Sequence, residues 1–379
     1  MTRRVLIAGG GTAGHVFPAV AVAKQLQRLA DVEPVFVGVA DRLEARLVPQ
    51  AGFRLHHVQA VSVPRRPSPR LLRLPRAVRA SVRECERILD EEEAEVVATF
   101  GGYVSFPVSR AAARREVPLI IHEQNAVPGL ANRVSSRWAG DIAVSFPGSA
   151  DRFRRPERCA VTGNPVREQM LELDLDARRV AAREGFGLEP DRPTLLVFGG
   201  SQGARSLNRA VVDAHQRWGD VDVQILHAAG QALYPEAAAA WEEARARSDG
   251  PRVRLVDFIE DMGEAYAAAD VVVCRSGATS IAELTALGLP AVLVPYPHAT
   301  GDHQRHNAEA LERIGAAALV PDDQLDGRRL VETVAPLLTD PEHRARVAAA
   351  ARTFGRRDAA TNVAQLILGA LDRHHRSPT

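Results

Sequence analysis

The fold is decided at Leu6-Ile7-Ala8-Gly9-Gly10-Gly11-Thr12-Ala13-Gly14-His15, where a short apolar strand runs into a glycine-rich turn and then into a helix. The same succession returns at Leu196-Val197-Phe198-Gly199-Gly200-Ser201-Gln202-Gly203-Ala204-Arg205. Beyond both stretches, continuous apolar runs alternate with amphipathic ones, which indicates parallel sheets covered by helices on both faces. The sequence therefore predicts two doubly wound α/β domains in tandem, whose strands end on either side of one cleft.

The periodicity places strands and helices along both halves. In the first half we expect strands at 5–8, 35–39, 96–100, 119–122 and 142–146, and helices at 16–29, 76–89 and 106–115. In the second half we expect strands at 194–198, 221–226, 253–258, 271–273 and 291–294, and one or two helices within 341–374.

Composition excludes several classes of protein. With 48 basic and 47 acidic residues among 379, the net charge of +1 provides no global attraction to nucleic acid. Cys85, Cys159 and Cys274 are widely separated, which argues against disulfides and zinc and for a reducing compartment. Residues 1–8 form no signal peptide, and no segment holds eighteen consecutive apolar residues. We therefore expect a cytoplasmic protein whose membrane contact is peripheral.

The run Cys274-Arg275-Ser276-Gly277-Ala278-Thr279-Ser280-Ile281-Ala282-Glu283 is the strongest local signal of function. A buried strand breaks at a glycine, and a helix follows with a carboxylate expected in its first turn. The helix start suits phosphate oxygens, and Glu283 suits the hydroxyls of a ribose. The alternative is that Ser280 and Glu283 form a capping box, which needs no ligand.

The first glycine-rich turn, 9–15, does not fit dinucleotide binding. It lacks the GxGxxG arrangement, and no acid ends the second strand near Val39, with Asp41 a weak candidate. His15, at the start of the following helix, is either a general base or a residue hydrogen-bonded to backbone.

Two further turns of the first half carry polar residues after strands. Phe100-Gly101-Gly102-Tyr103-Val104-Ser105 is another glycine-rich turn before a helix, and His122-Glu123-Gln124-Asn125 ends the next strand. Residues at such strand ends commonly line a binding cleft.

The stretch 296–307 leads into a helix that carries Gln304 and Asn307 on one face. Their amides suit sugar hydroxyls or a uracil edge. The three histidines of this stretch match no common zinc spacing, so we expect no metal. Two Asp-x-Asp matches, at 174–176 and at 220–222 where a strand is expected to open, are interpreted as solvated turns.

The stretch 65–79 interleaves arginines with leucines. Such a segment can rest on an anionic bilayer, or it can be an ordinary solvated loop and helix face.

Taken together, eight motifs make the chain resemble the MurG family of bacterial glycosyltransferases. They follow in that family's order and span almost the whole chain: GGGTAGHVFPA, FGGYVSFP, HEQNAVPGLANR, GNPVR, FGGSQGARSLN, DFIEDM, CRSGATSIAELTALGLP and DHQRHNA. The resemblance implies a GT-B fold of two Rossmann-like domains. Residues 1–165 would be the acceptor and membrane-side domain, 166–344 would bind UDP-GlcNAc, and a helix from about 345 to 379 would pack back onto the first domain.

The implied reaction is transfer of GlcNAc from UDP-GlcNAc to the C4 hydroxyl of MurNAc in lipid I, with inversion, no cofactor and no required metal. The implied donor-binding residues are Thr12, Ala13, Gly14, Asn125, Arg167, Ser201, Ile259, Ala278, Thr279, Ser280, Glu283, Gln304 and Asn307. Gly101, Gly102 and Tyr103 would lie on the acceptor side.

His15 and Glu123 are the candidates for deprotonating or orienting the acceptor hydroxyl, and a base of near-neutral pKa favours His15. The resemblance also favours membrane contact at the cytoplasmic face through Arg70, Leu71, Leu72, Arg73, Leu74 and Arg76. UDP-GlcNAc, lipid I and other cell-wall synthesis proteins are the implied partners, and nucleic acid is not.

Three departures from the family pattern lie on the acceptor side: Thr99, Phe106 and the stretch 62–66. Alternative functions are a related UDP-sugar transferase with another acceptor, a UDP-GlcNAc 2-epimerase on the same fold, and a silent nucleotide-sugar sensor.

Overall fold

Two compact units make up the structure, a computed structural model that describes residues 2–59, 70–200 and 202–376, with the backbone alone at 70–73 and 376. The first unit is Met1–Arg167 with Arg356–Thr379, and the second is Glu168–Gly355. From the sequence we expected the two boundaries at residues 165 and 344. The structure assigns the helix Pro341–Phe354 to the second unit and not to the first.

The first unit is built on a parallel sheet in the order β3-β2-β1-β4-β5-β6-β7. Its strands are β1 (Arg3–Ala8), β2 (Val32–Gly38), β3 (Arg54–His57), β4 (Val96–Thr99), β5 (Leu119–Glu123), β6 (Asp141–Val144) and β7 (Cys159–Val161). Its helices are α1 (Ala13–Leu29), α2 (Glu44–Gln50), α3 (Arg70–Glu91), α4 (Ser105–Arg114), α5 (Leu130–Ser135) and α15 (Ala359–Arg376).

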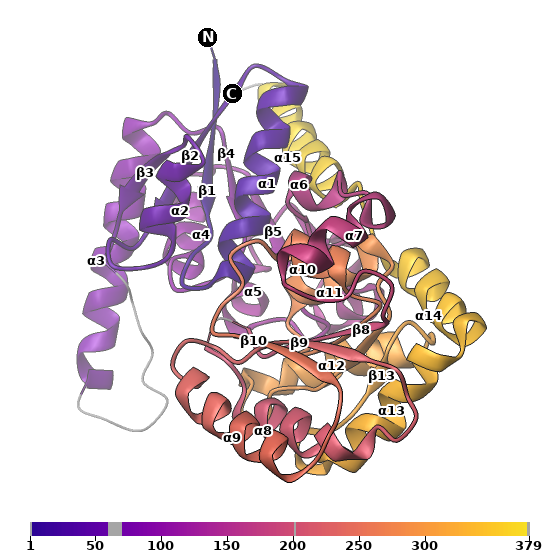
Figure 1. The fold of residues 1–379 in the computed structure, drawn as a ribbon. Helices are drawn as coiled ribbons and strands as arrows, with labels where there is room; N and C mark the ends of the chain where they lie inside the picture. The colour runs from indigo at the N-terminus through magenta and orange to yellow at the C-terminus, as the bar shows by residue number, and fades with distance from the viewer. Residues whose placement is uncertain (1, 60–69, 201, 377–379) are drawn as a thin grey trace. The chain divides into compact units, whose positions relative to one another are not determined.

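Alternate residues of the first strand enter opposite cores, as the two-residue period of a strand requires. Val5 and Ile7 join a cluster with α1 and α15, which lie side by side in Figure 1. Leu6 and Ala8 join a second cluster that α3 and α4 cover. Both faces of the sheet are therefore buried, which explains why the strands are apolar without interruption.

The second unit repeats the plan with a parallel sheet in the order β10-β9-β8-β11-β12-β13. Its strands are β8 (Thr194–Phe198), β9 (Gln224–Ala228), β10 (Arg252–Val256), β11 (Val271–Cys274), β12 (Ala291–Leu293) and β13 (Ala318–Leu319). Its helices are α6 (Glu168–Leu171), α7 (Leu175–Gly185), α8 (Arg205–Asp213), α9 (Tyr234–Arg247), α10 (Met262–Ala268), α11 (Ala278–Leu287), α12 (His303–Glu312), α13 (Gly327–Thr339) and α14 (Pro341–Phe354).

The expectation of two α/β units with parallel sheets is confirmed. The sequence did not predict the short helices α2 and α5 or three short strands. These strands are β3 and β7 at the two edges of the first sheet and β13 at an edge of the second. Exposed edge strands carry a weaker apolar signal than central ones. The strand expected to begin at Val221 begins later, at Gln224. Asp220 and Asp222 therefore lie before this strand, whereas the sequence had predicted that they open it.

Each sheet has a switch point, where the strand order reverses and ligands bind in this architecture. In the first unit it lies between β1 and β4, and in the second between β8 and β11. The glycine-rich turns singled out in the sequence follow these four strands, except that the β11 turn has a single glycine. The topology therefore assembles one candidate site at each switch point.

Candidate active site

The glycine-rich turn after β8 is held by direct backbone contact with the turn after β9. Gly203 and Gly230 both have positive φ, +71° and +88°, and a Cβ on Gly203 would lie 2.2 Å from the carbonyl oxygen of Ala229. Only glycine permits this approach. Ser201, predicted to hold pyrophosphate, lies outside the described residues.

Beside this turn, α11 begins at Ala278 directly after β11. Its N-cap residue is Gly277, so no side chain caps the first turn. The hydroxyl of Thr279 is buried and has no hydrogen-bond partner among the described residues. A helix start with an unsatisfied hydroxyl and no capping side chain is suited to an anionic oxygen.

The structure corrects two expectations about Glu283. The first turn of α11 carries no acid, because Glu283 lies in the second turn. Ser280 lies inside the helix and not at its N-cap, so the capping-box interpretation is wrong. Glu283 is 5% exposed, and its Oε2 accepts a hydrogen bond of 3.0 Å from the hydroxyl of Tyr266.

Gln304 and Asn307 share one face of α12, as predicted, and both hold the β11 turn. The side-chain amide of Asn307 is completely buried and donates to the carbonyl oxygen of Ser276 at 3.2 Å. Ser276 Oγ donates in turn to the backbone oxygen of Gln304 at 2.8 Å. The side-chain oxygen of Gln304 accepts from the backbone N–H of Tyr296 at 2.9 Å. Asn307 therefore positions the turn from behind, because a completely buried side chain offers no surface to a ligand.

Arg275 organises the same turn, and the sequence interpretation overlooked it. Its guanidinium donates to the carbonyl oxygens of Val294 and Pro295, at 3.3 and 3.1 Å, and to Ser206 Oγ at 2.9 Å. It also pairs with Asp322. An arginine at the end of a completely buried strand was the available signal, because a charge there must find partners.

The predicted uracil reader, Ile259, follows β10 and is 6% exposed. Its neighbour Phe258 is 43% exposed, and Asp261 caps α10 by accepting from the backbone N–H of Gly263 at 2.8 Å. The DFIEDM stretch thus combines a capped helix with an exposed aromatic ring.

In the first unit, the turns after β1 and β4 interlock. Gly102 has a φ of +90°, and a Cβ there would lie 2.2 Å from the carbonyl oxygen of Gly10. A Cβ on Gly101 would lie 2.8 Å from His15 Nε2. Tyr103, 45% exposed, contacts the Gly11 side of the same junction. The predicted acceptor-side glycines therefore lie against the turn that carries His15.

His15 lies in the first turn of α1, where Thr12 is the N-cap and Ala13 and Gly14 precede the histidine. His15 Nδ1 is 2.9 Å from the carbonyl oxygen of Gly10 and 3.1 Å from Thr12 Oγ1. A carbonyl can only accept, so Nδ1 must carry the proton in this contact. The neutral ring then has its lone pair on Nε2, where a base can accept a proton.

Glu123 is a buried carboxylate whose two oxygens are both engaged within its own loop. Oε1 accepts from the backbone N–H of Asn125 at 2.9 Å and from its side-chain amide at 3.3 Å. Oε2 accepts from the backbone N–H of Gly129 at 3.0 Å and from the amide of Asn132 at 2.8 Å. Burial raises the pKa of Glu123, against these hydrogen bonds, which lower it. Through these hydrogen bonds Glu123 holds together the segment from Asn125 to Asn132.

His122, the residue before Glu123, is fully buried. Its Nε2 donates to the carbonyl oxygen of Gly163 at 3.2 Å, and burial lowers its pKa to about 4. Arg167, the last residue of the first segment of this unit, places its guanidinium 4.6 Å from the ring centre of Phe17 in α1. It therefore lies beside α1, the helix that carries His15 in its first turn.

Among the described residues, no group of three or more His, Cys, Asp or Glu side chains is arranged to hold a metal ion. Of the two Asp-x-Asp matches, Asp174 caps α7 by accepting from the N–H of Ala177 at 3.1 Å. Asp222 pairs with Arg192 at 2.9 Å.

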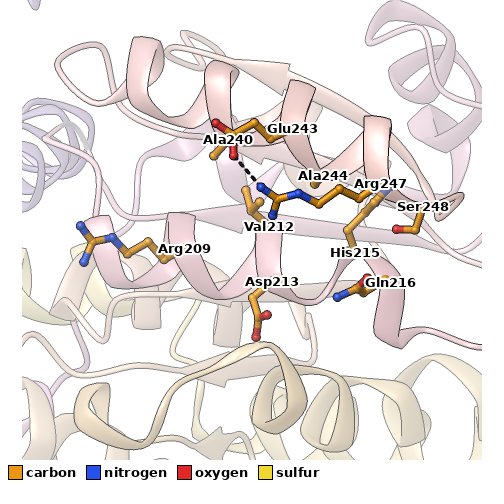
Figure 2. Close-up of a pocket in the computed structure, with 10 residues that line it drawn as sticks. All are labelled: Arg209, Val212, Asp213, His215, Gln216, Ala240, Glu243, Ala244, Arg247 and Ser248. Atoms are coloured by element: carbon orange, nitrogen blue, oxygen red, sulfur yellow. Dashed lines mark hydrogen bonds and ion pairs between the residues drawn. The ribbon is translucent and has the colours of Figure 1, made fainter.

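A cavity of about 290 Å³ between α8 and α9 contains none of the predicted site residues (Figure 2). It is lined by Arg209, Val212, Asp213, His215, Gln216, Ala240, Glu243, Ala244, Arg247 and Ser248. Arg247 pairs with Glu243, one turn earlier on α9, at 3.0 Å. Because its charges are of both signs and already paired, it favours no class of ligand.

Two neighbouring grooves of the first unit combine apolar floors with arginines, and we call them the arginine grooves. The first, of about 510 Å³, is lined by Val78, Arg79, Val82, Phe106, Arg110, Arg114, Arg137 and Trp138. The second, of about 400 Å³, is lined by Leu130, Arg133, Val134, Arg137, Arg152, Phe153 and Arg154. The guanidiniums of Arg110 and Arg137 lie 5.1 and 5.3 Å from the ring centre of Trp138.

The predicted membrane segment lies partly outside this description. Residues 60–69 are not described, and the side chains of Arg70, Leu71, Leu72 and Arg73 are not described either, although the four residues begin α3. Leu74 is half-buried and Arg76 is exposed. No helix within the described ranges is long and apolar enough to span a bilayer.

Comparison with known proteins matches both units to one family. Residues 5–144 match the N-terminal domain of glycosyltransferase family 28, and residues 194–363 match its C-terminal domain. A UDP-N-acetylglucosamine–N-acetylmuramyl-(pentapeptide) pyrophosphoryl-undecaprenol N-acetylglucosamine transferase from a Nocardioides species is 45% identical over 96% of this chain and 97% of its own length.

Solved structures agree with this match. The MurG crystal structure from Acinetobacter baumannii is 29% identical, covers 97% of this chain and 99% of its own, and superposes with a TM-score of 0.78. The UDP-GlcNAc 2-epimerase of Neisseria meningitidis is 13% identical, with coverages of 97% and 100% and a TM-score of 0.70. At that identity the second likeness concerns the fold alone.

Proposed function

Since the chain belongs to the MurG family within glycosyltransferase family 28, we propose that it transfers GlcNAc from UDP-GlcNAc to lipid I, the undecaprenyl-pyrophosphoryl MurNAc-pentapeptide, and so forms lipid II. The observation that carries the proposal is the 45% identity, over nearly the whole of both chains, to a relative named for this reaction. Lipid II is a precursor of the bacterial cell wall, so the proposed role is in peptidoglycan synthesis.

The second unit is proposed to hold the nucleotide at its switch point. Thr279 and Ser280, at the start of α11, would bind phosphate oxygens together with the positive end of the helix dipole. Glu283 would accept from the ribose hydroxyls, and the backbone at Ile259 would read the uracil. The unpartnered hydroxyl of Thr279 supports this assignment.

The first unit is proposed to supply the base. As the C4 oxygen of MurNAc bonds to C1 of GlcNAc, the bond from C1 to the β-phosphate oxygen breaks and UDP departs with the electron pair. The proton of the C4 hydroxyl passes to Nε2 of His15, and attack opposite the leaving group inverts the anomeric centre. The contact between Nδ1 and the Gly10 carbonyl supports this role, because it leaves the lone pair on Nε2.

The test of the function is release of UDP from UDP-GlcNAc with and without lipid I. Acceptor-dependent release with formation of lipid II is the expected result. Release only with a soluble acceptor would identify a transferase for another substrate, turnover of UDP-GlcNAc with no acceptor would identify an epimerase, and binding without release on any acceptor would identify a sensor.

Glu283→Gln tests the nucleotide site. Glutamine can still accept from Tyr266 but is a poorer acceptor for two ribose hydroxyls. We expect UDP binding to weaken by roughly 1 to 3 kcal/mol, with a nearly unchanged melting temperature. Isothermal titration with UDP measures the first quantity and scanning calorimetry the second. An unchanged Kd would remove Glu283 from the ribose site.

The arginine grooves are proposed to dock on the anionic inner face of the cell membrane. Apolar side chains between arginines suit the bilayer interface and its phosphates, and Leu130 is 74% exposed beside them. The described part of α3 continues into the first groove through Val78 and Arg79.

Reversing Arg110 and Arg137 to glutamate is expected to lower partition onto vesicles containing phosphatidylglycerol by at least about tenfold, since each arginine near an anionic surface contributes about 1 kcal/mol. Vesicle sedimentation measures the partition. The matched control reverses Arg209 and Arg247, which are exposed in the second unit. Equal losses for both pairs would show that net charge matters and the grooves do not.

A further inference from the structure

Beneath the His15 turn lies a carboxylate that neither the sequence interpretation nor the proposed reaction uses. Glu44, the first residue of α2, is 1% exposed, and no ion pair joins it to a described residue. Its Oε2 accepts from the backbone N–H of Gly11 at 2.9 Å, and its Oε1 accepts from the backbone N–H of Val39 at 3.1 Å.

The chain makes room for this carboxylate with two glycines. A Cβ on Gly10 would lie 2.4 Å from Glu44 Oε1, and a Cβ on Gly38 would lie 2.6 Å from Glu44 Cγ. Any larger residue at either position would displace the carboxylate. The carboxylate of Glu44 is thus packed directly against the first glycine-rich turn.

The N–H that Glu44 binds and the carbonyl that His15 binds belong to the same peptide group. The bond between Gly10 and Gly11 presents its N–H to Glu44 Oε2 and its C=O to His15 Nδ1, at 2.9 Å each. Hydrogen bonds that share a peptide polarise one another, so a negative charge at the N–H makes the C=O a stronger acceptor. A stronger acceptor favours the Nδ1–H form of the ring and stabilises the imidazolium.

We infer that Glu44 is a positioning residue for the transfer reaction, acting on His15 through the Gly10–Gly11 peptide. The relay fixes the proton on Nδ1, directs the lone pair to Nε2, and supports the positive charge that the ring acquires when it takes the acceptor proton. The inference rests on the proposed role of His15 as the base. A carboxylate in direct contact with histidine does the same in hydrolase triads, and here a peptide is interposed.

His122 also interacts electrostatically with His15, but it cannot take this role. His122, on β5, has its Nε2–H on the Gly163 carbonyl and a pKa lowered to about 4 by burial and by the charge of His15. It is therefore neutral near pH 7. Glu44, bound to the other side of the peptide that His15 contacts, is placed to compensate a charge on His15.

The test combines a spectroscopic and a kinetic measurement on the full chain. In Glu44→Gln the side chain keeps its shape, but it is neutral and can accept only one of the two N–H groups. We expect ¹⁵N chemical shifts of the His15 ring, assigned by comparison with His15→Ala, to show a shift from the Nδ1–H toward the Nε2–H form. We expect kcat to fall about tenfold to a hundredfold, with the KM for UDP-GlcNAc unchanged within about twofold.

Glu92→Gln is the matched control, because Glu92 is also a buried acid of the first unit, bound to Arg54 and His56 at 3.1 and 2.7 Å. It should lower the melting temperature without moving the His15 signals or kcat. An unchanged tautomer in Glu44→Gln, or an unchanged kcat, would overturn the inference. Should Glu44→Gln fail to fold, Glu44→Asp must lower the Nδ1–H population and kcat together, and a fall in kcat alone would refute the relay.

The same measurements separate this inference from the function on which it rests. The His15 tautomer reports on Glu44 whether or not His15 is the base. If His15→Ala retains kcat, the proposed base is wrong regardless of the Glu44 result. If His15→Ala loses kcat while the tautomer is insensitive to Glu44, the base stands and the relay fails.

Discussion

Replacing His15 with alanine is expected to lower kcat for GlcNAc transfer to lipid I by about 10²- to 10⁴-fold, the range that a positioned general base contributes. The ring is held by the contact of its Nδ1 with the Gly10 carbonyl oxygen, and it packs against Gly101, where a Cβ would lie 2.8 Å from Nε2. UDP binding should stay within about twofold of its original Kd, because the proposed nucleotide site belongs to the second unit. Steady-state kinetics with lipid I and titration with UDP measure the two effects.

His57→Ala provides the control, since His57 is an exposed histidine of β3 in the same unit. It should change neither kcat nor Kd. If His15→Ala keeps kcat within about fivefold, the base must be sought elsewhere.

Glu123→Ala is expected to destabilise the first unit by about 3 to 5 kcal/mol, because several donors lose their acceptor and each buried donor left unsatisfied costs about 1 to 3 kcal/mol. The substitution leaves the N–H groups of Asn125 and Gly129 and the amide of Asn132 without their acceptor. Urea unfolding followed by circular dichroism measures the change. A positioning role for Glu123 predicts this loss, whereas a role confined to catalysis does not.

Glu91→Ala is the comparison, because Glu91 is a half-exposed acid of α3 whose ion pair to Arg87 is at the surface. Its removal should change the unfolding free energy by no more than about 0.5 kcal/mol. A Glu123→Ala protein of full stability and no activity would return Glu123 to the list of candidate bases.

Periodicity was sufficient to predict the central strands of both sheets, because residues such as Val5 to Ala8 are buried on both faces and leave a continuous apolar run. Edge strands such as β3 were not predicted. Their side chains are only partly buried, so their sequences lack a continuous apolar run. The start of α11 was misjudged by a few residues. Which residue becomes the N-cap depends on where the backbone leaves β11, and Ser280 and Gly277 are both plausible from composition.

The site residues were predicted where a side chain follows a glycine-rich turn, as at His15 and Thr279. Glu44 was not predicted, because the dinucleotide-binding pattern places an acid at the end of the second strand, near Val39. The carboxylate that contacts Val39 comes instead from the next helix, α2. Glu123 shows the converse case. The sequence identified a polar cluster after β5 but could not show that the oxygens of Glu123 accept from N–H groups two and six residues away.

The pairing of α1 with α15 has a consequence for biosynthesis. Ile367 and Leu371 complete a core that includes Val5 and Val16, which are made more than three hundred residues earlier. When Gly355 has been synthesised, every segment of the second unit, Glu168–Gly355, is therefore present, while the first unit still lacks α15. The first unit, whose synthesis begins first, is therefore the last to have its core complete. Its apolar residues that pack on α15 stay exposed to solvent until α15 has been made.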